Sequence, residues 1–412
     1  MFPKGNFYGN VRDFAGADMR ARSMFHADMG RPSPTNLLAS LLVLAPLLAS
    51  ATAEAQVHLS LFHPVAINSG SEAHANLALS IFQSRIGELD GIALHPLVSE
   101  VSGPASGLQV TGAFVLVRGP MSGIQLTGGV ASVHGSVKGL QAAGIGSFVT
   151  GDVHGLQVAG IVNAPRGDVR GIQGAGFVNM NAGETRGLQV STVANVSEGP
   201  VRGIQLAAGV NLAQQTMRGL QIGLGNMAGS IDGTQIGFYN VSSHSTGLQL
   251  GVINYAGTHE GIPFGLLNLS PKSGTVEAVL YGSTLSAANA GVRTTVNGWQ
   301  STIAGGYGDL EGDVSTAGFV TWAYGYRIGA GSTWSLGFDV GWSHVMPEKS
   351  DDPLENDRLH PALSARLLPE VRLSDSISLF AGPGVTTILD EYSMHADSRT
   401  EVLGVAGLAV RP

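Results

Sequence analysis

Polar and apolar positions recur through the middle of the chain with a fixed period of sixteen residues. Each unit opens with Gly, then Leu or Ile, then Gln, as in GLQVAGIVNAPRGDVR from Gly155 and GIQGAGFVNMNAGETR from Gly171. From Gly219 onward the spacing shortens to fourteen residues, through Gly233 and as far as Gly261. Self-similarity at a short fixed period indicates a repeat architecture in which neighbouring units stack on one another.

Two columns of side-chain amides follow this repeat. Gln occupies the third position of ten successive units, and an Asn follows later in most of them. If the units stack at the strand spacing of about 4.8 Å, identical amides lie above one another and can hydrogen bond along the stack. We expect a structural ladder built from Gln109, Gln125, Gln141, Gln157, Gln173, Gln189, Gln205, Gln221, Gln235, Gln249, Asn163, Asn179, Asn195 and Asn211.

The units favour strands over helices. Each contains two or more Gly, which cost about 1 kcal/mol apiece inside a helix, whereas the Val, Ile, Leu and Phe residues suit short strands. Sixteen residues at about 3.3 Å each trace a circuit of roughly 50 Å, which fits one coil of a flattened β-solenoid. One core column is expected from Leu108, Ile124, Leu140, Leu156, Ile172, Leu188 and Ile204, and a second from Val137, Val153, Val169 and Val201.

Two other arrangements fit the same period. Each unit could supply one longer strand of an antiparallel meander, or the repeats could form the wall of a single large outer-membrane β-barrel. Neighbouring GLQ segments would be antiparallel in both, whereas the solenoid requires them to be parallel. Strand direction therefore separates these alternatives.

After residue 274 the period changes to two. In TWSLGFDVGW, Trp334 and Phe338 face one way while Asp339 and Gly341 face the other, and ALSARLLPEVRL alternates in the same manner. Apolar-out and polar-in alternation over about ten residues, with turns between, is typical of a transmembrane β-barrel. The residues from 275 onward accommodate about eight strands, the smallest common barrel. A soluble antiparallel sandwich with one solvated face is the alternative.

A barrel of this kind makes two further predictions. Aromatic side chains at the membrane interfaces would come from Trp299, Trp322, Tyr324, Tyr326, Trp334 and Trp342. The inward-facing charges would close the lumen as an ion network made of Asp339, Arg366, Glu370 and Arg372.

The N-terminal part reads as a targeting segment. NLLASLLVLAPLLASATAEA at 36–55 is a short apolar stretch followed by small residues and an A-x-A site, which predicts signal cleavage between Ala55 and Gln56. A membrane anchor is the alternative. The predicted organisation is a signal region at 1–55, whose true start could be Met29, an N-terminal cap at 56–90, a GLQ-repeat solenoid at 91–274, and an antiparallel β-barrel-like domain at 275–412.

Composition excludes several functional classes. The net charge is −8, which gives no electrostatic footprint for nucleic acid, and the absence of Cys excludes disulfides and thiolate sites. No P-loop, GxSxG, HExxH, EF-hand loop or strand-linked GxGxxG occurs. We therefore expect no cofactor, no metal site and no catalytic residues.

Three weaker chemical signals remain. Asp152, Asp168 and Glu184 recur in register and form an acidic column of the kind a carbohydrate-cleaving β-helix enzyme could use, although a solvated, charge-balanced face is the plainer interpretation. His58 and His63 are more typical of ordinary polar positions than of metal ligands. The Asn column could display a sugar-binding ladder, but Asn more often stabilises turns.

With the repeats laid out, the chain resembles the bacterial, leptospiral-type surface-repeat proteins. The shared features are LSLFHPV after the signal, tandem GLQxGxxN units such as GLQIGLGN and GLQLGVIN, and a β-rich C-terminal part. The likeness spans roughly 56–274, and the sixteen-residue units depart from the family's shorter form. It implies a surface or outer-membrane location without an assigned activity.

These observations predict an exported, non-enzymatic cell-envelope repeat protein of structural, adhesion or interaction type. Its expected partners are outer-membrane or cell-surface components, and the sequence leaves a glycan or protein ligand undetermined. A secreted carbohydrate-active β-helix enzyme and the single large barrel are the alternatives.

Overall fold

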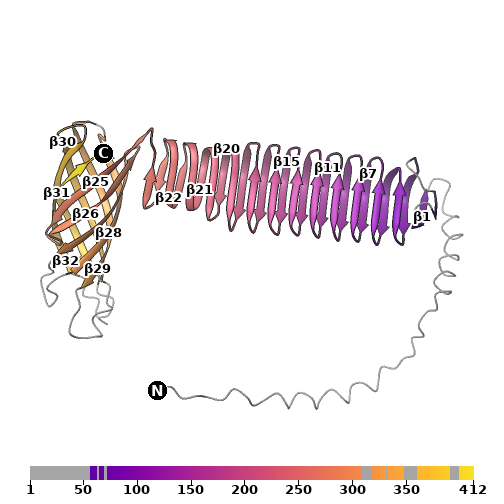
Figure 1. Ribbon diagram of the computed structural model, residues 1–412, viewed down its shortest axis with the longest axis horizontal. Coiled ribbons are helices and arrows are strands. Elements are labelled where there is room, and N and C mark those ends of the chain that lie inside the picture. Colours follow the sequence, from indigo (N-terminus) through magenta and orange to yellow (C-terminus); the bar gives the residue numbers. More distant parts are fainter. Residues whose placement is uncertain are drawn as a thin grey trace, which may run out of the picture. The chain divides into compact units, whose positions relative to one another are not determined.

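The computed structural model describes residues 56–62, 65–68, 72–308, 317–330, 332–347, 360–389 and 399–412. The described chain is all-β: strands β1–β24 form a solenoid of about thirteen turns, and β25–β32 form a closed antiparallel barrel (Figure 1). The predicted signal region, including Ala55, lies outside the described residues. Gln56 is the first residue that the structure describes.

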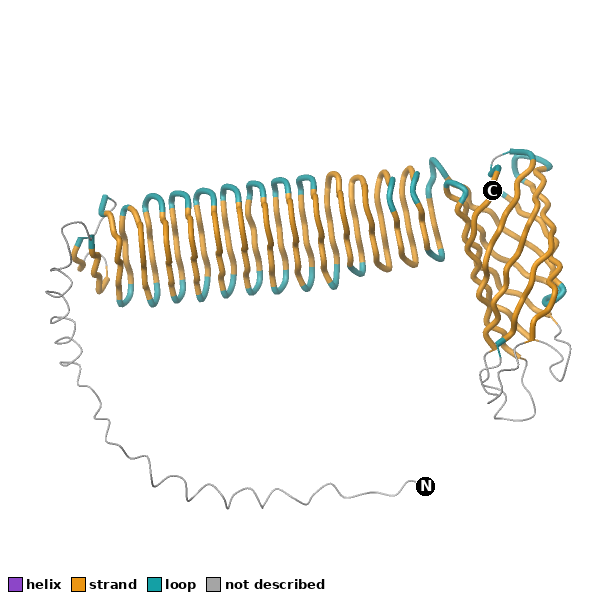
Figure 2. Tube along the Cα trace, turned by 180° about the vertical axis from the view of Figure 1, so that it is seen from behind, coloured by secondary structure: helices purple, strands orange, loops and turns teal. Residues whose placement is uncertain are grey.

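Each sixteen-residue coil contains one long and one short strand, joined by two turns (Figure 2). The long strands are β3 (His74–Ser80), β5 (Glu88–His95), β7 (Ala105–Thr111), β9 (Met121–Thr127), β11 (Val137–Ala143), β13 (Val153–Ala159), β15 (Val169–Ala175), β17 (Thr185–Ser191) and β19 (Val201–Ala207). The short strands are β4 (Gln83–Ile86), β6 (Val98–Val101), β8 (Phe114–Val117), β10 (Val130–Val133), β12 (Gly146–Val149), β14 (Val162–Pro165), β16 (Val178–Asn181) and β18 (Ala194–Ser197).

The remaining solenoid strands lie at its two ends. β1 (Val57–Phe62) pairs antiparallel with β2 (Val65–Ile67) and parallel with β3, so coil stacking already begins within the predicted cap. At the other end the strands are β20 (Val210–Ile222), β21 (Gly225–Ser245), β22 (Leu248–His259), β23 (Ile262–Phe264) and β24 (Leu267–Leu269).

Neighbouring coils pair in parallel and in register. Gln157 lies opposite both Gln141 and Gln173, one period away on either side. Parallel pairing is incompatible with an antiparallel meander and with a large barrel built from the repeats, so the solenoid prediction is confirmed. The shorter units keep the register, because Gln235 pairs with Gln249 and Asn240 with Asn254.

The leading Gly of each sixteen-residue unit is required by the close approach of successive coils, and several units carry a second Gly after the long strand. Gly155 has a φ of 132°, which side chains other than Gly rarely adopt, and a Cβ there would collide with the carbonyl oxygen of Gly139. Gly160 begins the turn after the long strand, where a Cβ would collide with the Gly144 carbonyl oxygen. A side chain at Gly155 would therefore push two coils apart, whereas the position equivalent to Gly160 is occupied by Thr192 and Ala208 in later coils.

The Gln column lies inside the solenoid. All ten residues are buried, and from Gln125 onward each Nε2 donates to the Oε1 of the preceding Gln, for example Gln173 to Gln157 at 2.8 Å and Gln189 to Gln173 at 2.8 Å. Gln109 begins the series by donating to Ser99 Oγ at 3.0 Å. At Gln249 the series stops, because Pro263 occupies the next position and leaves the Gln249 Oε1 without a donor.

The Asn column forms a second internal ladder of opposite polarity. Asn163 Nδ2 donates forward to Asn179 Oδ1 at 2.9 Å, and the pattern continues through Asn195 and Asn211 to Asn268. The same Nδ2 of Asn163 also reaches the Gly174 carbonyl at 2.8 Å, which ties the short-strand sheet to the long-strand sheet. Neither the turn role nor the sugar display expected from the sequence is correct, because these residues are buried within strands.

The predicted Leu/Ile core column is wrong. Ile124 and Ile172 are 44% and 45% exposed, and Leu156 and Leu188 are only half-buried, because this column lies on the outer face of the long-strand sheet. Alternation along the strand gives the physical reason: the buried Gln forces the adjacent residue to point outward. The Val column is buried as expected, at Val137, Val153, Val169 and Val201.

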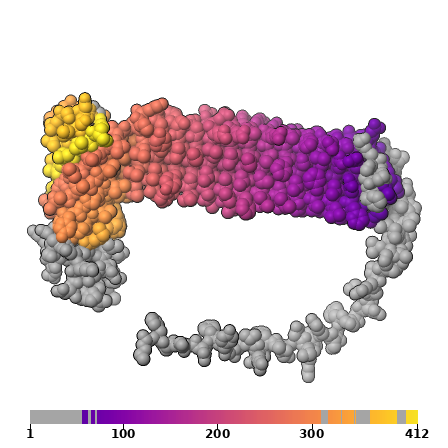
Figure 3. All heavy atoms as spheres, viewed as in Figure 1, coloured from indigo at the N-terminus to yellow at the C-terminus, as the bar shows by residue number. Residues whose placement is uncertain are grey.

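The interior of the solenoid therefore combines the amide ladders with small apolar residues such as Val137 and Val153, while larger apolar residues such as Ile172 lie on its outer surface. We call the turn from a short strand into the next long strand the charged edge, and the turn from a long strand into a short strand the apolar edge. Ile145, Ile161, Phe177 and Val193 are exposed on the apolar edge. Figure 3 shows the coils packed as one unbroken surface.

The barrel closes through pairing of its first and last strands. Its strands are β25 (Gly274–Ser283), β26 (Ala288–Val296), β27 (Trp299–Gly308), β28 (Ala317–Ile328), β29 (Trp334–Pro347), β30 (His360–Arg372), β31 (Ile377–Ile388) and β32 (Arg399–Val410). All neighbours are antiparallel, and Leu280 of β25 lies opposite Leu408 of β32. The closed eight-stranded barrel predicted from the alternation is confirmed, and the open sandwich is excluded.

Two imidazoles are buried in the solenoid. His95 and His259 are 2% and 1% exposed, and their ring nitrogens have no hydrogen-bond partner. Burial lowers the pKa of His95 to about 4, with a smaller contribution from His58, and burial lowers the pKa of His259 to about 4, with a smaller contribution from His244. Both side chains are neutral in the folded protein near neutral pH.

Substitutions at Gln189 and Leu188 should show which column is the core. Gln189→Leu removes the acceptor of Gln205 and the donor to Gln173, and each unpaired buried group costs roughly 1–3 kcal/mol. Leu188→Ser, on the outer face, should change the free energy of unfolding by less than about 1 kcal/mol. Denaturant unfolding of the mature chain in detergent measures both. A larger loss for Leu188→Ser would contradict the inward placement of Gln189.

Acid should destabilise the solenoid over a defined range. Because the His95 pKa falls from 6.5 to about 4 on folding, the unfolded chain takes up a proton first, so stability is complete above 6.5 and declines until about pH 4. The loss attributable to His95 approaches about 3 kcal/mol. His95→Thr, which places the residue of the paired position Thr111 there, should remove that share of the pH dependence. The same change at His154, on the outside, serves as control, and an unchanged pH profile in His95→Thr would refute the assignment.

Candidate functional site

The charged edge places the sequence-predicted acids in one column. Asp152, Asp168 and Glu184 occupy equivalent turns of successive coils, beside the basic column that contains Arg170 and Arg186. Asp152 Oδ1 accepts the backbone N–H of Asp168 at 2.8 Å, and Asp168 Oδ1 accepts that of Glu184 at 2.9 Å. The first two carboxylates thus cap the backbone of the following coil.

Glu184 ends this column in a cluster of arginines. Its Oε2 lies 2.7 Å from Arg186 Nη2 and its Oε1 lies 3.1 Å from Arg202 Nε. The hydrogen bond from Arg186 is the largest cause that lowers the pKa of Glu184 below its usual value. General-acid catalysis needs a raised carboxyl pKa and acids that converge in a groove. The three acids lie one per coil along the charged edge and bind the backbone of the next coil or arginines, so they do not converge in a groove and the carbohydrate-cleaving site is not assembled here.

Of the two histidines singled out near the start of the described chain, His58 has a structural role. His58 is buried, with Nδ1 2.6 Å from the Asn68 carbonyl oxygen and Nε2 3.0 Å from Ser84 Oγ. His63 lies outside the described residues. Across the described ranges, His, Asp and Glu do not gather in groups of three that could hold a metal ion.

The most concentrated chemistry lies in the barrel lumen. Arg366 Nε donates to Asp339 Oδ1 at 2.7 Å, and its Nη2 donates to Asp339 Oδ2 at 3.2 Å. Gln300 Nε2 lies 3.4 Å from the same carboxylate, and Tyr281 packs beneath the guanidinium. Asp339 and Arg366 therefore form an ion pair inside the lumen, as expected from the sequence.

A second group of charges fills the lumen toward the end where β25 begins. Arg293 Nη2 bridges Glu277 Oε2 at 2.7 Å and Glu370 Oε2 at 2.9 Å, and Arg327 Nη1 contacts Glu370 Oε1 at 3.1 Å. Arg411 Nη2 reaches Glu277 Oε1 at 3.0 Å. Sequence reasoning missed Glu277, Arg293, Arg327 and Arg411. The alternation of inward and outward positions along β25, β26 and β28, and its continuation after β32, could have identified them.

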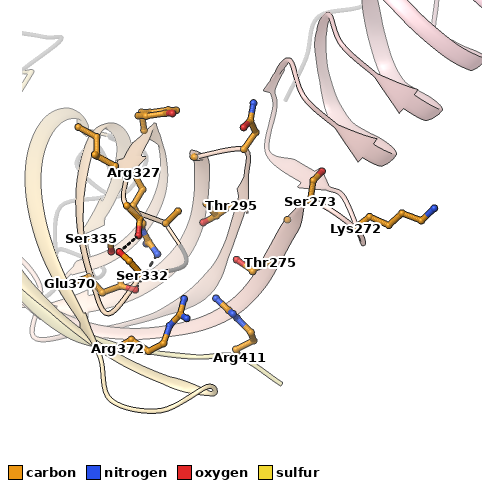
Figure 4. Close-up of a pocket in the computed structure, with 17 residues that line it drawn as sticks. Lys272, Ser273, Thr275, Thr295, Arg327, Ser332, Ser335, Glu370, Arg372 and Arg411 are labelled. Carbon is orange, nitrogen blue, oxygen red and sulfur yellow. Dashed lines mark hydrogen bonds and ion pairs between the residues drawn. The ribbon is translucent and has the colours of Figure 1, made fainter.

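At the end of the barrel where β25 begins, the lumen opens into a cavity of about 500 Å³, which we call the mouth. Its lining includes four basic residues, Lys272, Arg327, Arg372 and Arg411, and one acidic residue, Glu370. Figure 4 shows the Arg372 and Arg411 side chains extending in the same direction from the barrel wall. Arg372 therefore lies at the mouth rather than within the plug. Two of these basic residues are already paired, Arg327 with Glu370 and Arg411 with Glu277.

The outer wall of the barrel is apolar. Phe338, Val340, Leu367 and Leu379 are exposed, whereas the intervening Asp339 and Arg366 are buried in the lumen. Among the predicted girdle residues, Trp299, Tyr326 and Trp334 lie near the short connections 297–298 and 329–333. Trp322 and Trp342 instead lie opposite each other in the middle of β28 and β29. The register therefore places both residues about half a strand away from either end of the barrel.

The last solenoid coil contacts this outer wall. Tyr324 Oη donates to the Pro263 carbonyl at 2.8 Å, and Ser301 Oγ donates to the Leu266 carbonyl at 2.9 Å. The Phe264 ring lies edge-on to Trp322 with 5.6 Å between centroids. Outward-facing residues of β26–β28 are thus covered by protein, which the sequence did not predict.

No family model matches the chain, and no curated protein shows significant similarity to it. Among solved structures, the crystal structure of Neisserial surface protein A (NspA) matches at 11% identity and a TM-score of 0.25, with 34% of this chain and 96% of that chain covered. A likeness of this size carries no argument about function. None of the described residues belongs to a helix long and apolar enough to cross a bilayer.

The Asp339–Arg366 pair should behave as a buried ion pair. Arg366→Leu leaves the Asp339 carboxylate with only Gln300, and losing one partner of such a pair typically costs about 3–5 kcal/mol. The double variant Asp339→Leu/Arg366→Leu should recover most of that stability, since no charge remains buried alone. Lys272→Leu, at the exposed rim, is the matched control. Urea unfolding in detergent measures all four, and equal stability of Arg366→Leu and the unaltered chain would contradict the pairing.

Proposed function

We propose that this protein is a non-enzymatic component of the bacterial outer membrane, held there by its barrel, and that the solenoid is its interaction module. The observation that carries the proposal is the wall of β25–β32, with apolar residues outside and charged residues inside. That arrangement suits a lipid environment, because outer-membrane barrels carry an apolar outer band around a polar interior.

The barrel serves as an anchor rather than a channel. An eight-stranded barrel is just wide enough for its interior to be filled by side chains. Here the lumen holds Arg366 against Asp339 and Arg293 between Glu277 and Glu370. These paired charges occupy the space through which a solute would pass.

The connections between strands orient the barrel. At the end where the solenoid joins through Gly274, the connections are 297–298, 329–333 and 373–376. At the opposite end they are 284–287, 309–316, 348–359 and 389–398, three of which are longer. Outer-membrane barrels place short turns in the periplasm and longer loops outside the cell. We therefore place the solenoid on the periplasmic side in this proposal.

Peptide-tag accessibility tests both anchor and orientation. A tag inserted within 348–359 should be reached by antibody on intact cells, and the protein should fractionate with the outer membrane. The same tag inserted beside Glu198, on the charged edge of the solenoid, should be reached only after the outer membrane is permeabilised. Labelling of the Glu198 tag on intact cells would contradict the proposed orientation. Recovery of the protein in the soluble fraction would contradict the proposed membrane anchor.

A further inference from the structure

The solenoid separates charged and apolar side chains onto opposite edges. Between Gly119 and Leu269, every Asp, Glu, Lys and Arg lies on the charged edge or beside it. These residues are Lys138, Asp152, Arg166, Asp168, Arg170, Glu184, Arg186, Glu198, Arg202, Arg218, Asp232 and Glu260. The apolar edge on the other side exposes Ile145, Ile161, Phe177, Val193, Leu224 and Phe238.

The two sheet faces beside the apolar edge are also apolar. The long-strand sheet exposes Ile124, Val158 and Ile172, and the short-strand sheet exposes Phe148 and Met180. Soluble monomers rarely expose a continuous apolar surface beyond a few hundred Å². This surface continues from coil to coil along the solenoid, so water is a poor solvent for it.

The backbone at the apolar edge does not depend on water either. The N–H of Ile161 donates to the Ile145 carbonyl at 2.8 Å, that of Phe177 to Ile161 at 3.1 Å, and that of Val193 to Phe177 at 3.0 Å. Lipid normally admits only helices and closed barrels, because unpaired backbone groups are costly there. At this turn the stacked coils likewise supply hydrogen-bond partners for these backbone N–H groups.

We propose that the apolar edge and the adjoining faces insert into the leaflet on the short-connection side of the bilayer that holds the barrel, while the charged edge stays in water. The proposal rests on the barrel anchor proposed above. The ligand is the acyl-chain layer of the membrane, and the solenoid lies in the membrane surface as an amphipathic element rather than crossing it.

The dimensions and the attachment of the solenoid support this placement. From Leu156, the first outward apolar residue of β13, to Ile161 at the edge, five residue steps span roughly 16 Å. One leaflet contributes half of a hydrocarbon core of about 30 Å. In addition, Phe264 of the last coil packs against Trp322 in the middle of β28, so the solenoid already contacts the barrel wall at the depth of its apolar band.

Site-directed spin labelling of the full mature chain in phospholipid vesicles tests the proposal. The protein has no Cys, so single substitutions label one site each. Phe177→Cys reports the apolar edge (55% exposed), Glu198→Cys reports the charged edge one coil away, and Val340→Cys (49% exposed) reports the barrel wall. Collisions with oxygen, which partitions into lipid, are compared with collisions with a water-soluble nickel chelate.

The proposal expects the Phe177 label to match the Val340 label, with oxygen favoured, and the Glu198 label to favour nickel. Nickel access at Phe177, with oxygen still favoured at Val340, would overturn the insertion and leave the anchor standing. Nickel access at Val340 would overturn both. Spin–spin broadening at Phe177 that disappears when labelled chains are diluted with unlabelled chains would show a second copy on this face, and would also overturn the proposal.

Discussion

The solenoid depends on one constraint: a side-chain amide buried away from water has to find its hydrogen-bond partners within the protein. Each Gln has the Gln of the coil before and the coil after as its partners, at distances near 2.8 Å. This pairing requires identical residues at one strand spacing, which fixes parallel register. The Gly columns follow, because only Gly lets Gly155 approach the Gly139 carbonyl so closely.

The ladders also explain why the solenoid is apolar outside. Gln and Asn occupy inward positions in both sheets, so the strand alternation sends the residues beside them outward, as at Ile172 next to Gln173. The barrel repeats this arrangement, with Asp339 and Arg366 inside and Phe338 and Val340 outside. Both modules therefore pair polar groups internally and present apolar groups on much of their outer surface, an arrangement that suits a lipid environment.

Most of the architecture could be predicted from the sequence, because repetition and alternation report directly on local geometry. The sixteen-residue period gave the coil, and the period of two after residue 274 gave the barrel strands. The face of each column could not be predicted in the same way. Leu188 was assigned to the core because apolar side chains usually avoid water. The structure instead buries its neighbour Gln189.

In the candidate site, too, some features could be predicted from the sequence and others could not. Asp339, Arg366 and Glu370 were predictable as lumen residues, because alternation within one strand assigns them to a face. Glu277 and Arg293 carried the same alternation signal and were missed, but the pairing of Glu277 with Arg411 was not predictable, because closure of the barrel alone brings these two residues together. By itself the sequence determined the period, the strands and the partners along each ladder, all of which are set by spacing. The tertiary structure alone decided which side of each strand faces inward and which charges meet, because those depend on contacts between residues distant in the chain.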